Sequence, residues 1–158
     1  METRVIRSAR RRKTVSARVV DGILQVSIPD AMTSAEETHW VAVMQERIER
    51  KIRSAGVDLA RRARDLARRF GLPEPVSIGF SDRQRRQWGS CTYEEGRIRL
   101  SSRLADFPPW VLDYVIVHEL AHLVVPDHSP AFWDLVNRYP LTERARGYLI
   151  AKDEEPVA

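Results

Sequence analysis

Alternating hydrophobic and polar positions near the start of the chain predict a β-hairpin. The alternation runs through Thr14–Val20 and again through Ile23–Ile28. Between them stands Asp21-Gly22, a pair suited to a two-residue turn, because both positions of such a turn take positive φ angles. We assign residues 1–30 to this hairpin.

The pattern changes to a helical period over residues 33–70. Thr33 or Ser34, followed three residues later by a glutamate, makes a plausible capping box at the start. Hydrophobic positions then recur three and four apart, first at Trp40, Val41, Met44 and Ile48 and then at Leu59, Ala63, Leu66 and Phe70. Gly56 separates the two runs and Gly71 closes the second, so two consecutive helices are predicted.

Residues 75–102 return to a period of two. Hydrophobic residues alternate from Val76, and extended stretches follow at Gln87–Thr92 and Arg97–Ser101, with a turn at Glu94–Gly96 between them. We predict a small antiparallel or mixed sheet in this segment.

The last hydrophobic segments predict two helices, over residues 109–125 and 129–138. Val115-Ile116-Val117 has the propensity of a strand, so the first helix rests on the length of the run and on the metal site described below. Pro126 is expected to stop this helix. The fold class is α+β, with an N-terminal β-hairpin, a long helix, and a small sheet over a second, buried helix.

The length and composition of the chain favour one cytoplasmic domain. A chain of 158 residues can bury one core, and we expect a single domain over residues 1–152 with a disordered acidic tail at 153–158. The arginine-rich start lacks the hydrophobic region of a signal peptide. A single cysteine, Cys91, suits a reducing compartment. The run Trp110–Val125 is too short and too polar to span a membrane, so no membrane partner is expected.

Basic residues outnumber acidic ones by 26 to 22, and all but three of the basic residues are arginine. They cluster at Arg10–Lys13 and again at Arg83, Arg85 and Arg86. Such clusters can bind nucleic acid or acidic partners, although we interpret them first as solvated faces and strand edges. No aromatic residue interleaves the first cluster, which argues against base stacking there.

Three of the four histidines of the chain fall within eleven residues, as His118, His122 and His128. The motif His118-Glu119-Leu120-Ala121-His122 places two imidazoles one turn apart on the same face of a helix. His128 follows after an interval long enough for the chain to leave the helix and return to the same point. Three protein ligands with a fourth position open are typical of a catalytic zinc site.

We therefore predict one zinc ion per chain, bound by His118, His122 and His128. Three neutral imidazoles leave the zinc ion its double positive charge, which lowers the pKa of a bound water toward neutrality. Glu119 can act as general base on that water and later protonate a leaving amine, so the predicted activity is peptide-bond hydrolysis. Iron or nickel also bind three histidines, but an open three-histidine site with an adjacent glutamate favours the hydrolytic chemistry of zinc.

Other residues near the motif are weaker candidates. Tyr114 lies one turn before His118, but we interpret an aromatic residue on a buried helix as part of the core. Glu143 could compete with His128 as third ligand, although it lies past Pro140 in a short segment. Residues that could hydrogen-bond a ligand, judged by proximity in sequence alone, are Asp127, Asp134 and Tyr139.

The spacing of the histidines also resembles the metzincin pattern HExxHxxGxxH. That superfamily has a glycine where this chain has Val125, and it needs a methionine turn after the motif. The three methionines, Met1, Met32 and Met44, all precede the motif. The resemblance to metzincins therefore fails at two defining points.

Four segments together resemble the bacterial YgjP-like metallopeptidase family, which is similar to the WLM and SprT-like zinc proteins. They are SARRRKTVSARVVDGILQVSI at Ser8–Ile28, WGSC at Trp88–Cys91, IRLSSRL at Ile98–Leu104 and DYVIVHELAHLVVPDHSPAFW at Asp113–Trp133. WGSC followed by HELAH and HSxxFW is a specific combination. The chain departs from the family at Ser101-Ser102, where the family often has an asparagine, and this concerns a local turn.

The resemblance implies a zincin-like or gluzincin-like α+β domain in which a mixed sheet lies over the active-site helix. It implies that His118, His122 and His128 bind zinc and that Glu119 is the catalytic base. A sheet edge, for which residues 86–101 are the candidates, would bind the backbone of a peptide or protein substrate by strand addition. We interpret Trp88 and Cys91 as core packing. The family leaves the physiological substrate undefined.

Two other functions compete with this interpretation. One is a DNA-associated protein, either a protease of the SprT or WLM type or a basic binding module, and it requires a coherent basic surface. The other is a zinc-stabilised scaffold without turnover. Glu119 argues against the scaffold, because a structural zinc site closes its fourth position and needs no base.

Overall fold

The computed structural model describes residues 1–154, so residues 155–158 of the predicted tail lie outside the described part. The described chain divides into two compact units, one from Met1 to Ile52 and one that begins at Arg53. Each unit has a hydrophobic cluster of its own. A hydrophobic pattern in the sequence marks which faces are buried but not which of them share a core.

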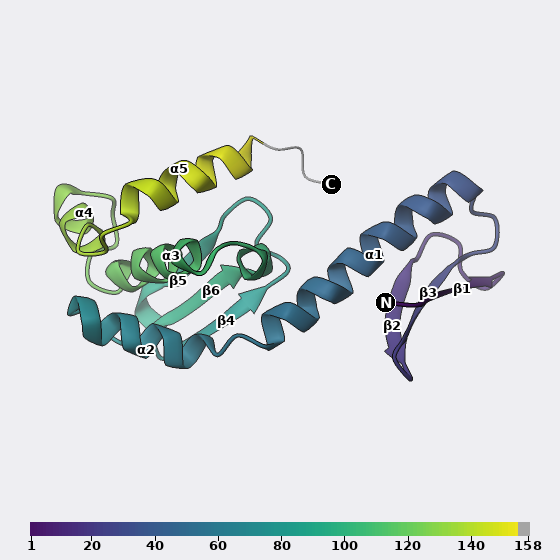
Figure 1. The fold of residues 1–158 in the computed structure, drawn as a ribbon, viewed down its shortest axis with the longest axis horizontal. Coiled ribbons are helices and arrows are strands. Elements are labelled where there is room, and N and C mark those ends of the chain that lie inside the picture. Colours follow the sequence, from purple (N-terminus) through teal and green to yellow (C-terminus); the bar gives the residue numbers. More distant parts are fainter. Residues whose placement is uncertain (155–158) are drawn as a thin grey trace. The chain divides into compact units, whose positions relative to one another are not determined.

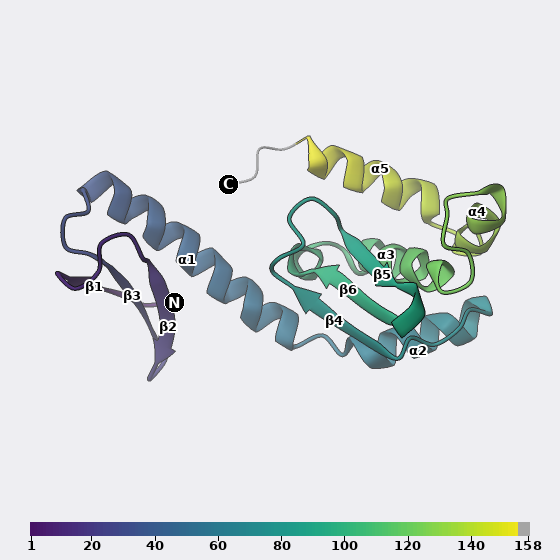
Figure 2. The ribbon, with the colours of Figure 1, turned by 180° about the vertical axis from the view of Figure 1, so that it is seen from behind.

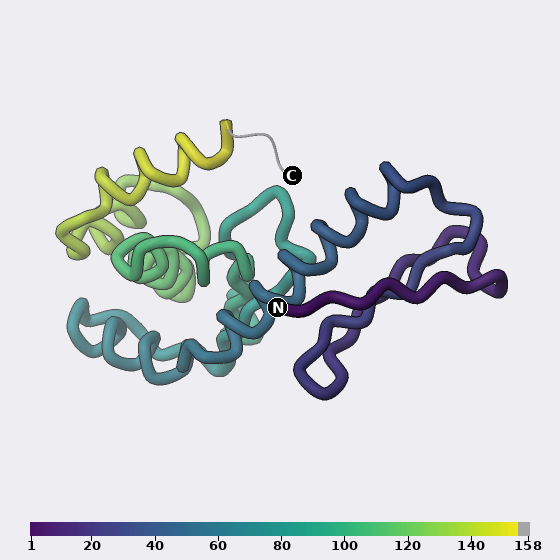
Figure 3. The backbone as a smooth tube through the Cα atoms, turned by 45° about the vertical axis from the view of Figure 1, so that its right-hand side comes forward, coloured from purple at the N-terminus to yellow at the C-terminus, as the bar shows by residue number. Residues whose placement is uncertain are grey.

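The first unit contains a three-stranded sheet with the order β1-β3-β2. Strands β2 (Ser16–Val20) and β3 (Ile23–Pro29) form the predicted hairpin, and Asp21 and Gly22 at its turn have φ angles of 50° and 77°. Strand β1 (Thr3–Ser8) was not predicted. It runs parallel to β3 along its other edge (Figure 3), a pairing that local alternation does not specify.

Helix α1 (Ser34–Ala55) begins with the predicted capping box. The backbone N–H of Thr33 donates to the Glu36 carboxylate at 2.8 Å, and the Glu36 N–H donates to Thr33 Oγ1 at 3.3 Å. Met44 of this helix packs with three buried residues of β3, namely Leu24, Val26 and Ile28. The helix therefore covers one face of the first sheet.

Helix α2 (Leu59–Phe70) opens the second unit, after the predicted break at Gly56. The Asp58 carboxylate accepts from the backbone N–H of Arg61 at 3.0 Å and caps the start of the helix. Gly71 ends it in the left-handed conformation, with φ of 64°. A face with Leu59, Ala63, Leu66 and Ala67 is buried.

The second sheet contains β4 (Ser77–Ser81), β5 (Gly89–Thr92) and β6 (Arg97–Ser101) in the order β4-β6-β5. The β5–β6 pair is antiparallel, but β4 runs parallel to β6, so the sheet is mixed rather than antiparallel. The connection at residues 82–88 is long enough to carry the chain past β6, which leaves β5 at an edge. Two short 3₁₀ helices, Tyr93–Glu95 and Ser102–Asp106, precede and follow β6.

Helix α3 (Pro109–His122) is the buried centre of the second unit. It contacts α2, the sheet, α4 (Pro130–Val136) and the last helix, α5 (Thr142–Asp153). Figures 1 and 2 show α2 and α3 on the same side of the sheet. The β-branched run in α3 is helical, as its length predicted. Five of its residues are fully buried, namely Val111, Ile116, Val117, Leu120 and Ala121.

Several predicted boundaries in the second unit were wrong, and the helix predicted over residues 129–138 ends at Val136. Helix α3 ends at His122 rather than at residue 125, and the amides of Val124 and Val125 both bond to the Ala121 carbonyl in a tight turn before Pro126. Helix α5 was not predicted, because only Thr142, Ala145 and Leu149 of its twelve residues are buried. Asp153 therefore belongs to a helix and not to a tail.

Within residues 1–154, none of the helices is both long enough and hydrophobic enough to traverse a lipid bilayer.

The left-handed conformation of Gly71 predicts that Gly71→Ala lowers the free energy of unfolding by about 1 kcal/mol. An added Cβ would lie 3.2 Å from Arg138 Nη1 as well as adopting a strained φ. Gly147→Ala is the matched control, because Gly147 lies in exposed α5 with no atom within 4 Å of an added Cβ, and should stabilise the protein by about 1 kcal/mol. Urea unfolding measures both. If Gly71→Ala were as stable as wild type, the left-handed conformation of Gly71 at the end of α2 would be contradicted.

Candidate metal centre

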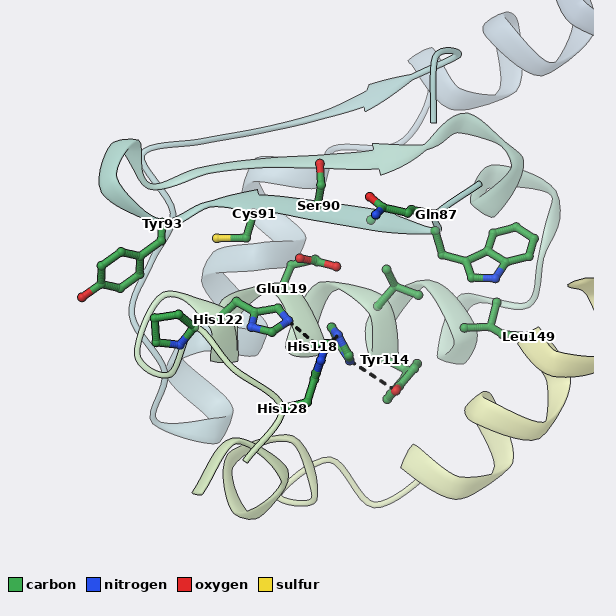
Figure 4. Close-up of a pocket in the computed structure, with 14 residues that line it drawn as sticks. Gln87, Ser90, Cys91, Tyr93, Tyr114, His118, Glu119, His122, His128 and Leu149 are labelled. Carbon is green, nitrogen blue, oxygen red and sulfur yellow. Dashed lines mark hydrogen bonds between the residues drawn. The ribbon is translucent and has the colours of Figure 1, made fainter. Parts of the chain in front are cut away.

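Helix α3 presents His118 and His122 one turn apart on the side of the helix that faces a pocket of about 530 Å³ (Figure 4). Because the helix ends at His122, the chain turns at once, and the segment after Pro126 returns His128 to the same point. The prediction that these three imidazoles converge agrees with the structure. They come from the last turn of one helix and from the loop before the next.

The three imidazoles meet through their Nε2 atoms. His128 Nε2 lies 3.2 Å from His122 Nε2 and 3.3 Å from His118 Nε2. Ligand atoms about 2.0–2.1 Å from a tetrahedral zinc ion would be separated by about 3.3 Å. Within the described part of the chain, one potential ligand atom from each of His118, His122 and His128 lies within 4.8 Å of the other two. The donor set therefore fits a single metal ion.

Hydrogen bonds and burial keep two of these rings ready to bind a cation. His122 Nδ1 lies 3.1 Å from the Val125 carbonyl, so this nitrogen carries the proton and Nε2 keeps its lone pair. Burial, reinforced by the neighbouring imidazoles, lowers the pKa of His118 to about 3. Burial also lowers the pKa of His122. Neutral imidazole is the form that binds a metal ion.

Tyr114 lies closer to the centre than the sequence suggested. It is buried, as a core residue would be, but its hydroxyl lies 3.4 Å from His118 Nδ1 and its side chain lines the pocket. Burial raises the pKa of Tyr114 to about 12, so the hydroxyl stays protonated. A hydroxyl four residues before a histidine on a helix was the available signal, and it was assigned to packing alone.

Glu119 is 4 % exposed and extends from α3 toward β5. Burial raises the pKa of its carboxyl to about 8, and no basic side chain of the described chain offsets this effect. Gly89 lies directly against the carboxyl group, since a Cβ added there would lie 2.6 Å from Glu119 Oε1. The glycine of the WGSC motif therefore makes room for Glu119, a role that the sequence did not reveal.

Strand β5 forms the opposite wall of the pocket. Gln87, Trp88, Ser90 and Cys91 line it together with Gly89. Trp88 also packs on Phe107 with ring centroids 5.2 Å apart, and the Arg103 guanidinium lies 4.1 Å from the centre of its ring. Trp88 and Cys91 therefore pack against the core, as predicted, and in addition line the pocket.

Helix α5, which the sequence did not predict, also lines the pocket. Leu149 lines the pocket, as Trp88 and Val115 do, so part of the lining is hydrophobic. Glu143, considered as an alternative ligand, lies on the same helix with its side chain 80 % exposed and pairs with Arg146 at 3.1 Å. It is not part of the histidine group.

Two of the other polar candidates, Tyr139 and Asp127, form hydrogen bonds with groups other than the three histidines. Tyr139 donates its hydroxyl to the Trp110 carbonyl at 2.8 Å, at the far end of α3. The Asp127 carboxylate accepts from the Ser129 N–H at 3.3 Å and shapes the turn before α4. Phe132 packs against the histidines instead, with its ring stacked on the His122 imidazole and the two ring centroids 4.4 Å apart.

Comparison with known protein families identifies the family of this chain. The model described as the YgjP-like metallopeptidase domain matches residues 52–150, which is more than half of the chain. The chain belongs to the YgjP-like family. The match includes the three histidines, Glu119 and the WGSC motif, and it begins where the first unit ends.

A solved structure shares the fold. The metallopeptidase zymogen of Pyrococcus abyssi abylysin superposes with a TM-score of 0.53 at 20 % identity, covering 61 % of this chain and 96 % of that chain. This agrees with the predicted zincin-like α+β class. No curated protein matches the chain.

The raised pKa of Glu119 predicts how the metal-free protein responds to pH. A carboxyl whose folded pKa is raised lowers stability as pH rises from about 4.5 to 8, because the unfolded chain ionises first. The stability of Glu119→Gln relative to wild type should therefore increase over this range, by at most about 1.4 kcal/mol per pH unit. Urea unfolding in the presence of a chelator measures this difference at each pH. A constant difference would contradict the burial of the carboxyl.

Proposed function

We propose that the chain is a zinc-dependent peptidase, with one zinc ion per chain bound by His118, His122 and His128. The convergence of three Nε2 atoms at 3.2 and 3.3 Å carries this proposal. A bound zinc ion supplies Lewis acidity toward the scissile carbonyl and lowers the pKa of a water molecule. Neutral imidazole ligands and an adjacent carboxyl favour zinc among the divalent metals that bind histidine.

Glu119 is the proposed general base. Its carboxyl lies in the pocket beside the histidines, with Gly89 behind it, so it can accept a proton from a water molecule and deliver that proton to the leaving amine. No covalent intermediate is required. Its placement also argues against the zinc scaffold, since a structural site has no use for a buried base at its open side.

Strand β5 is the proposed support for the substrate. It is an edge strand that lines the pocket, so its outer edge can pair with the backbone of an extended peptide. Tyr114, through its 3.4 Å contact with His118 Nδ1, orients that imidazole. The hydrophobic part of the lining, which includes Trp88, Val115 and Leu149, favours a peptide with an apolar side chain at one position.

Metal stoichiometry tests the ligand set. Wild-type protein freed of any affinity tag should contain about one zinc ion per chain, and His128→Ala should bind zinc at least about a hundredfold more weakly. Elemental analysis after dialysis and competition with a chromophoric chelator measure the two quantities. Glu143→Gln is the control and should bind zinc as wild type does. The three-histidine ligand set would be contradicted if Glu143→Gln lost as much zinc affinity as His128→Ala, or if His128→Ala lost none.

Replacing the proposed base separates binding from chemistry. Glu119→Gln has nearly the same shape as wild type, so it should keep the zinc ion and lower the kcat of peptide hydrolysis by about 10²–10⁴-fold. Cleavage of a library of short peptides with apolar residues, followed by mass spectrometry, measures the rate. Unchanged turnover in a zinc-loaded Glu119→Gln protein would exclude Glu119 as the base.

A further inference from the structure

The unit from Met1 to Ile52 precedes the metallopeptidase match and holds most of the excess charge of the chain. Residues 1–30 contain seven basic and three acidic side chains, so their net charge of +4 equals that of the entire protein. The rest of the chain contains equal numbers of basic and acidic residues. The charge is therefore concentrated on the first sheet and its loops.

One face of this sheet carries a row of polar and basic side chains. The strand register places Arg4 and Arg18 on either side of Gln25. Leu24 and Val26, the neighbours of Gln25, are fully buried under α1, so the row points to the opposite, solvent-exposed face. Arg18 Nε donates to Gln25 Oε1 at 3.3 Å. The next row on this face contains no carboxylate and consists of Ile6, Ser27 and Ser16.

The loop at residues 9–15 extends this charge along one end of the sheet. It connects β1 to β2, which are opposite edges, and must therefore cross the end of β3. Its basic residues Arg10, Arg12 and Lys13 are exposed and form no hydrogen bond or ion pair with any residue in the 1–154 range. We call Arg4, Arg18 and Arg10–Lys13 the basic strip.

The acidic residues of α1 do not neutralise the basic strip. Helix α1 packs on the buried face of the sheet through Met44, away from the row that contains Arg4. Two of its carboxylates are already paired, since Glu37 lies 2.5 Å from Arg7 and Glu46 lies 2.5 Å from Arg50. The strip thus lies on a sheet with a net positive charge, because the three acidic residues of residues 1–30, Glu2, Asp21 and Asp30, are outnumbered by seven basic ones.

We propose that the basic strip binds the phosphodiester backbone of nucleic acid, so that the first unit is a nucleic-acid-binding module attached to a metallopeptidase unit. Five of its six residues are arginines, whose planar guanidinium groups bind phosphate oxygens in pairs. A polymer with regularly spaced phosphates can contact the row and the loop together. Ile6, 37 % exposed, is too small a hydrophobic surface for insertion into a membrane.

This surface lacks the features of sequence-specific recognition. No aromatic residue lies in the row or in the loop, so bases have no stacking platform. Backbone contacts alone carry no sequence information. The strip should therefore bind DNA and RNA of unrelated sequences with similar affinity, and the binding should depend steeply on salt.

Fluorescence anisotropy of the full chain with labelled single-stranded DNA, RNA and duplex DNA tests the proposal. Wild type should bind at 50 mM salt and weaken as salt increases. The triple substitution Arg10→Gln, Arg12→Gln and Lys13→Gln should reduce the slope of log affinity against log salt by about 2 for a single strand. It should leave zinc content and peptide cleavage unchanged, which separates this test from that of the proposed peptidase.

The matched control removes three exposed arginines from α2, through Arg61→Gln, Arg64→Gln and Arg68→Gln. It should keep the wild-type slope. The proposal would be overturned if wild type did not bind nucleic acid at 50 mM salt. It would also be overturned if both triple variants reduced the salt slope equally. Binding to phosphatidylserine vesicles or polyglutamate without binding to nucleic acid would also overturn it. A loss of binding in the double variant Arg83→Gln and Arg99→Gln, but not in the strip variant, would overturn it as well, since Arg99 lies on β6 and Arg83 in the connection after β4.

Discussion

Burial of helix α3 is the constraint on which the candidate centre depends. The helix lies against α2, the sheet and α5, and fully buried Ile116, Val117 and Leu120 fix its position and rotation. That environment keeps the His118 imidazole neutral and disfavours a charge on Glu119. Unprotonated ring nitrogens and a buried carboxyl without a basic partner both favour a cation at this point. The core that folds the second unit thus also prepares the ligands.

The sheet contributes as much to the centre as the helix does. Glu119 can occupy its place only because β5 has a glycine at residue 89, and β5 is held there by its antiparallel pairing with β6. The pairing of both β4 and β5 with β6 leaves β5 at an edge of the sheet, and its residues line the pocket. The WGSC motif therefore lines the pocket of the candidate centre as well as packing against the core.

Local chemistry in the sequence was sufficient to predict some features and not others. The spacing of His118 and His122, the turn at Asp21-Gly22 and the left-handed Gly71 depend on neighbours in sequence, and the structure agrees with each. The parallel strands, the two separate cores, and the approach of Leu149 to the pocket depend on contacts between distant segments. Hydrophobic periodicity cannot specify such contacts, and in α5 the period itself is weak.

The coordination number and ligand types of bound zinc show whether the three histidines form an open zinc site or part of a closed structural one. X-ray absorption at the zinc edge, on protein loaded with one zinc ion per chain, distinguishes nitrogen and oxygen ligands at about 2.0–2.1 Å from sulfur at about 2.3 Å. The account predicts three imidazole nitrogens and one light ligand from solvent, with no sulfur. A sulfur ligand, which only Cys91 or a methionine could supply, or a fourth ligand from the protein would mean a closed structural site and would contradict the proposed peptidase.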